Sequence, residues 1–122
     1  MQLGAVPMNC AERNALQTAR RHLSPDDIAK RIAHARLGIR LASRSLLAHD
    51  PGRARVMTTR SIIDLEHALR GLQEGGHPRA KAQGVQEAVC ALQRAEAYAD
   101  AKQRPPGVMA LADAHVALGG VA

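Results

Sequence analysis

Apolar residues recur at alternating spacings of four and three along two successive stretches, and this pattern restricts the chain to helices that pack along one face. In the first stretch the repeating residues are Ile28, Ile32, Ala35, Ile39, Ala42 and Leu46. Residues 24–27, Ser-Pro-Asp-Asp, precede this stretch. The serine hydroxyl can cap a helix, the proline suits its first turn, and the two carboxylates are favoured near the positive end of its dipole. A long helix is therefore predicted to begin at this motif.

A short turn joins the first stretch to the second. The repeating positions of the second stretch are Thr58, Ile62, Leu65, Leu69 and Leu72. Between the two stretches, Asp50 can cap a new helix and Pro51 can occupy its first position, while Gly75 and Gly76 end that helix. Because the connection is so short, the two helices are predicted to form an antiparallel hairpin.

A third helix is predicted from Pro78 to about Gln103, with a face made of Val85, Ala88, Val89, Leu92, Ala95 and Ala99. The Pro-Pro-Gly run at residues 105–107 is expected to break it. A shorter fourth helix is predicted from Val108 to Leu118. The residues available for burial in the fourth helix are Val108, Leu111, Ala112, Val116 and Leu118.

The composition agrees with an all-α fold. The 122 residues are 46% hydrophobic but only 1% aromatic, so the core is expected to consist of thin aliphatic layers in one domain. We predict an antiparallel up-down bundle of three long helices and a shorter fourth over residues 24–118. An N-terminal segment, residues 1–23, precedes it, with a capping-box spacing that indicates a peripheral helix over residues 9–22, and residues 119–122 form a tail.

No motif in the sequence predicts a catalytic, metal or cofactor site. Asp64 and Glu66 are two residues apart and point away from each other on a helix, which favours a solvated face. The histidines have neither paired four-residue spacing nor neighbouring cysteines. Cys10 and Cys90 are too far apart for a metal motif, and Cys90, among aliphatic residues, is predicted to lie in the core. We expect a protein that is not an enzyme.

The sequence also bears on the compartment. The N-terminus lacks the continuous apolar segment of a secretory signal, and no stretch approaches the roughly 20 apolar residues that span a bilayer. We therefore expect a cytoplasmic protein whose membrane contacts, if it has any, are peripheral.

Positive charge is concentrated in the first half of the chain. The formal net charge is +6, and residues 20–60 carry most of the arginines with only a few aspartates. Arg36, Arg40 and Arg44 occupy every fourth position, so they form one stripe of like charge on a helix, with no carboxylate three or four residues away. Leu37 and Leu41 lie roughly opposite the apolar seam, which gives this helix a second apolar face.

Several interpretations of the stripe stay open. The helix can be central in the bundle, with its arginines solvated or paired with Glu66, Glu74 or Glu87 on other helices. The stripe can instead neutralise phosphates of a nucleic acid. In that interpretation the basic surface is widened by Arg53, Arg55 and Arg60. A protein partner that packs on the second apolar face is the remaining interpretation.

The order of these signals resembles the FliS-type family of flagellar secretion chaperones, which bind flagellin. The shared features are a Ser-Pro helix start, an Ile-Ile-containing stretch and a Gly-Gly before the third helix. The matching residues are Ser24, Pro25, Ile62, Ile63, Leu65, Leu69, Gly75 and Gly76. The resemblance covers roughly residues 16–100, and Gln86 and Ala88 lie where the family usually has an aromatic pair.

This resemblance implies a non-enzymatic cytoplasmic export chaperone that binds amphipathic helices of a secretion substrate such as flagellin. The leucines would then fill the contact with the client, and the arginines would pair with its acidic residues. The predicted partner-binding residues are Ile28, Arg36, Leu37, Arg40, Leu41, Arg44 and Leu47. The alternatives are a basic nucleic-acid-binding or regulatory helical protein and a purely structural oligomer.

Overall fold

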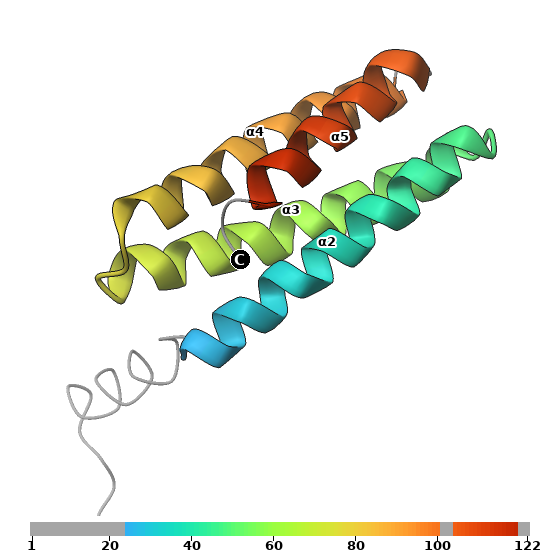
Figure 1. Cartoon of the computed structure of the whole chain (residues 1–122). Helices are drawn as coiled ribbons and strands as arrows, with labels where there is room; N and C mark the ends of the chain where they lie inside the picture. The colour runs from blue at the N-terminus through green and yellow to red at the C-terminus, as the bar shows by residue number, and fades with distance from the viewer. Residues whose placement is uncertain (1–23, 101–103, 120–122) are drawn as a thin grey trace, which may run out of the picture.

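The computed structural model describes residues 24–100 and 104–119, and these residues form four helices with no strand among them (Figure 1). The helices are α2 (Pro25–Leu47), α3 (Pro51–Glu74), α4 (Arg79–Asp100) and α5 (Arg104–Gly119). Each helix packs on the next in the chain, and α5 closes back on α2. The predicted all-α bundle of three long helices and a shorter fourth is confirmed, whereas the helix predicted over residues 9–22 lies outside the described residues.

The predicted helix starts are confirmed at the first two helices. The backbone N–H of Asp27 donates to Ser24 Oγ at 3.2 Å, and that of Arg53 donates to Asp50 Oδ1 at 3.1 Å. Pro25 and Pro51 occupy the first turns. Between these helices His49 takes a positive φ of 61°, and Gly76 takes one of 68° after α3, so the turns from α2 to α3 and from α3 to α4 each use the left-handed region.

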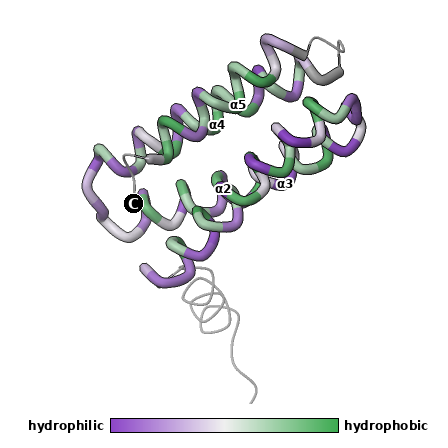
Figure 2. The backbone as a smooth tube through the Cα atoms, turned by 45° about the vertical axis from the view of Figure 1, so that its right-hand side comes forward, coloured by the Kyte–Doolittle hydropathy of each residue, from purple (hydrophilic) through white to green (hydrophobic). Residues whose placement is uncertain are grey.

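The core is made of small and aliphatic side chains from all four helices. The largest side chains that are fully buried are Leu65, Leu92, Leu111, Leu118 and Val85. Hydrophobic and hydrophilic residues are interspersed along α2, α3 and α4, as expected where one face of a helix packs inward and the other is solvated (Figure 2).

The contact between α2 and α3 is close because small residues line it. Gly38 of α2 lies against Ser61 of α3, whose hydroxyl donates to Met57 O at 2.9 Å and to Ala35 O at 3.3 Å. A Cβ added at Gly38 would overlap Ser61 Oγ. The buried hydroxyl thus has carbonyl partners on both helices, which satisfies its polarity and ties the hairpin together.

The fourth helix differs from the prediction at its start. It begins at Arg104 rather than Val108, so the Pro-Pro-Gly run is part of α5. Prolines are compatible with a first helical turn because the N–H groups there have no intrahelical acceptor.

The buried face of α5 also differs from the prediction. Leu111 and Leu118 are buried as expected, and Val108 is half-buried, but Ala112 and Val116 are exposed. The seam that packs inward is Ala110, Leu111, Ala114 and Leu118. Because α5 has apolar residues on all sides, the sequence did not distinguish the face that turns to the core.

Candidate protein-binding surface

All the predicted partner-binding residues lie on α2, and the structure separates two of them from the rest. Ile28 is only 4% exposed and belongs to the hydrophobic core, so it is not an exposed contact. Arg36 donates from Nη2 to the carbonyl oxygen of Leu118 at 2.6 Å and so holds the C-terminal end of α5. The sequence pattern groups Arg36 with Arg40 and Arg44 as a predicted partner-binding residue, and it does not reveal this contact with α5.

The other five residues lie on the side of α2 that is turned away from the core, and we call them the α2 outer face: Leu37, Arg40, Leu41, Arg44 and Leu47. Leu37 is 53% exposed and Leu47 is 62% exposed, whereas Leu41 is half-buried. By the helical period these residues occupy about a third of the circumference. The structure therefore brings exposed apolar side chains and guanidinium groups together on one surface.

The two exposed arginines of this surface are not neutralised within the described part of the chain. Arg40 and Arg44 make no hydrogen bond or ion pair with any described residue. Among those residues, no ion pair joins the stripe to Glu66, Glu74 or Glu87. The interpretation in which the stripe pairs with glutamates of other helices is therefore not observed for Arg40 and Arg44.

Asp64 supplies a cross-helix ion pair that the sequence analysis did not identify. Its carboxylate accepts from Arg31 Nη1 at 2.9 Å and lies 3.9 Å from His34 Nδ1, and its side chain is only 16% exposed. The prediction of a solvated face is wrong for Asp64. The carboxylate joins α3 to α2 beside the outer face, because Arg31 lies where the two helices approach each other.

Two clefts lie along α2, and the first includes residues of the α2 outer face. The first, of about 260 Å³, lies near the turn between α2 and α3 and is lined by Leu41, Arg44, Ser45, Ala48, Asp50 and Arg53. Arg44 and Arg53 come to this cleft from different helices, with the apolar side chain of Leu41 beside them. An apolar ligand segment that carries a carboxylate would find complementary groups there.

The second cleft exists because α5 is shorter than its neighbours. With 16 residues against the 23 of α2, α5 spans about 24 Å rather than about 34 Å, and it ends beside the middle of α2. At the end of the bundle that α5 does not reach, the described residues form a cleft of about 210 Å³ whose apolar lining includes Ile28, Ile32 and Leu72. Lys81 and His77 also line it.

The contact between Arg36 and Leu118 yields a prediction about the stability of α5. Replacing Arg36 with glutamine removes a charged donor from the last carbonyl groups of that helix, where a cation is also favoured by the helix dipole. We expect a loss of about 1–2 kcal/mol in the free energy of unfolding and faster amide exchange in the last turn of α5. Denaturant titration and hydrogen exchange would measure both, with Arg40→Gln as the matched control. Equal effects of the two variants would contradict this role.

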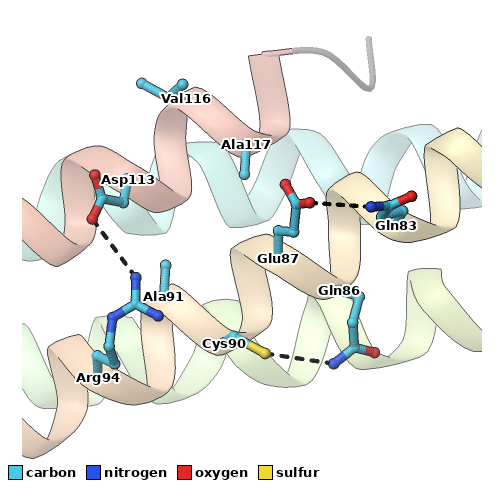
Figure 3. Close-up of a pocket in the computed structure, with 9 residues that line it drawn as sticks. All are labelled: Gln83, Gln86, Glu87, Cys90, Ala91, Arg94, Asp113, Val116 and Ala117. Carbon is cyan, nitrogen blue, oxygen red and sulfur yellow. Dashed lines mark hydrogen bonds and ion pairs between the residues drawn. The ribbon is translucent and has the colours of Figure 1, made fainter.

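The groups that could perform chemistry are dispersed. Among the described residues, no three His, Cys, Asp or Glu side chains are placed to hold a metal ion. Cys90 is exposed, so its predicted core position is wrong. It lines an open groove of about 530 Å³ between α4 and α5, and the Nε2 of Gln86 donates to its sulfur at 3.7 Å (Figure 3). In the same groove Arg94 pairs with Asp113 at 3.6 Å.

Exposed apolar residues also occur on helices that sequence reasoning did not single out. Val56 and Ile63 are exposed on α3, and Met109 and Val116 on α5. In the sequence, the exposed apolar residues of α5 could have been suspected because this helix is apolar on every side. The prediction assigned those residues to the core instead.

None of the described helices combines the length and the apolar character needed to cross a lipid bilayer. Comparison of the chain with protein-family models, curated proteins and solved structures finds no significant match. The function is therefore inferred from the geometry and charge of the surfaces described above.

Proposed function

We propose that this chain is a non-enzymatic binding protein that holds an amphipathic helix of a protein client against the α2 outer face, as a cytoplasmic export chaperone does. The observation that carries the proposal is the exposure of Leu37 and Leu47 beside Arg40 and Arg44, which have no partner among the described residues. Burial of the leucines under a client would stabilise the complex by about 25 cal/mol for each Å² of apolar surface removed from water.

The dimensions of the surface suit a helical client. Residues 37–47 extend over about 15 Å of α2, which matches nearly three turns of a bound helix. Such a helix would place apolar anchors three and four residues apart on the leucines. Acidic residues beside those anchors would pair with Arg40 and Arg44, and this charge preference would also exclude basic helices.

The resemblance to the FliS-type chaperones supports the same proposal, because that family binds a helix-forming export substrate and needs no catalytic group. Flagellin or another export substrate is accordingly the first client to test. The exposed leucines favour this function over nucleic-acid binding, since a phosphate backbone would pair with the arginines but leave the apolar side chains exposed.

The proposal is tested by affinity capture from the native host with nuclease-treated lysate and the intact chain as bait. We expect stoichiometric retention of an export substrate that resists about 0.5 M salt, because apolar burial is far less salt-sensitive than phosphate contact. Limited proteolysis of the complex should leave an amphipathic, acidic helical segment of the client protected. Recovery of nucleic acid alone from untreated lysate, released by the same salt, would instead support the nucleic-acid function.

A further inference from the structure

The solvent side of α5 carries an unbroken line of apolar residues. We call it the α5 outer stripe, and it consists of Pro105, Met109, Ala112 and Val116. Met109 is 68% exposed and Val116 is 75% exposed, more than any other large hydrophobic residue that the structure describes. Spacings of four, three and four residues place the stripe along one edge of the helix, opposite the buried seam. An apolar seam on each side is typical of a helix that is packed on both.

We propose that two copies of the chain associate through their α5 outer stripes. Each copy has a formal charge of +6, so the repulsion between two copies is smallest where they meet through a face with no uncompensated positive charge. The charged residues that line the groove beside Val116 are Glu87, Arg94 and Asp113. Arg94 and Asp113 form an ion pair, so Glu87, which accepts from Gln83, leaves this side with one negative charge and no uncompensated positive charge. The α2 outer face, in contrast, would bring the uncompensated charges of Arg40 and Arg44 together.

The sequence of the stripe is complementary to itself in an antiparallel pairing. With a two-fold axis next to Ala112, Met109 of one copy packs against Val116 of the other, and the small side chain at the centre allows the helices to approach. The same axis brings the Arg94–Asp113 pairs of both copies to one side of the interface, where the two Asp113 side chains lie nearest the axis and each carboxylate is neutralised by Arg94 of its own copy. Antiparallel helices also oppose their dipoles.

The groove between α4 and α5 enlarges the surface that a second copy can cover. Val116 and Ala117 line that groove together with Ala91 and Cys90, so it lies directly beside the stripe (Figure 3). A single pair of helices still buries less than the roughly 1,200 Å² of a standard stable complex. The dimer is therefore expected to be weak, with half-association at micromolar or higher concentration.

Sedimentation equilibrium of the full chain over about two decades of concentration tests the association. The mass should rise from the 13.0 kDa of one chain toward twice that value. Met109→Lys and Val116→Lys should each raise the dissociation constant at least about 10-fold. Ile63→Lys, at a side chain that is 49% exposed on α3, is the matched control and should leave it unchanged. A single 13.0 kDa species throughout, or a dimer that resists both stripe variants, would overturn the proposal.

Disulfide trapping then tests the pairing direction, in a background with Cys10→Ser and Cys90→Ser. Ala112→Cys should form a covalent dimer under mild oxidation because the two positions face each other across the axis. Met109→Cys alone should not, since its two copies would be about 10 Å apart along the helices. A mixture of Met109→Cys and Val116→Cys chains should cross-link. Self-cross-linking of Met109→Cys would overturn the antiparallel arrangement.

Discussion

The double variant Leu37→Asp/Leu41→Asp is expected to lose at least about 100-fold in client affinity, which corresponds to about 2.7 kcal/mol. Each substitution puts a carboxylate where the client's apolar anchor would be desolvated, and it does so beside arginines that would then pair within the chain instead of with the client. The effect should be seen as loss of the captured substrate and, with the purified client, by titration calorimetry.

The distinction between an interface and a core is made by stability measurements on the same variants. Leu37 is 53% exposed, so Leu37→Asp should leave the melting temperature almost unchanged, whereas half-buried Leu41 should contribute a modest loss. Ile63→Asp makes the same chemical change at an exposed residue of α3 and should retain the client. Unaltered binding by the double variant, or equal loss with Ile63→Asp, would exclude the α2 outer face as the binding surface.

The second large effect is expected at the contact between Gly38 and Ser61. Gly38→Ala should destabilise the protein by about 1–3 kcal/mol, because the added methyl overlaps Ser61 Oγ and forces the hydroxyl away from its carbonyl partners or the helices apart. This loss should exceed the gain of up to about 1 kcal/mol that alanine normally brings to the interior of a helix.

A double-mutant cycle isolates this contact. In a Ser61→Ala background the obstructing oxygen is gone, so Gly38→Ala should become neutral or stabilising. Denaturant unfolding of the four proteins, monitored by circular dichroism, would measure the change of sign. Additive effects of the two substitutions would show that the helices accommodate the methyl without using the space of the hydroxyl.

Features that depend on neighbours in the chain were predictable from the sequence. The caps at Ser24 and Asp50 were recognisable because each bonds a backbone N–H three residues away. The buried faces of α2 and α3 were also recognisable, since each has one apolar side and one polar side.

Features that depend on which helix lies opposite were not predictable in the same way. Arg36 and Arg40 have the same local pattern of neighbours, yet only Arg36 reaches the end of α5, since that helix stops beside it. Cys90 has aliphatic neighbours in the sequence but lies on the exposed edge of α4. Likewise Asp64 is paired because Arg31 lies across the hairpin from it, more than 30 positions earlier in the chain.

By itself, the sequence determined the helical class, the hairpin and the inward faces of the amphipathic helices, because short-range hydrogen bonds and apolar periodicity act within a few residues. Only the tertiary structure decided the inward face of α5, the cleft at the end of the bundle that α5 does not reach, and the division of the arginine stripe into one bound and two exposed side chains. These properties follow from the relative lengths and positions of whole helices, and no local spacing encodes them.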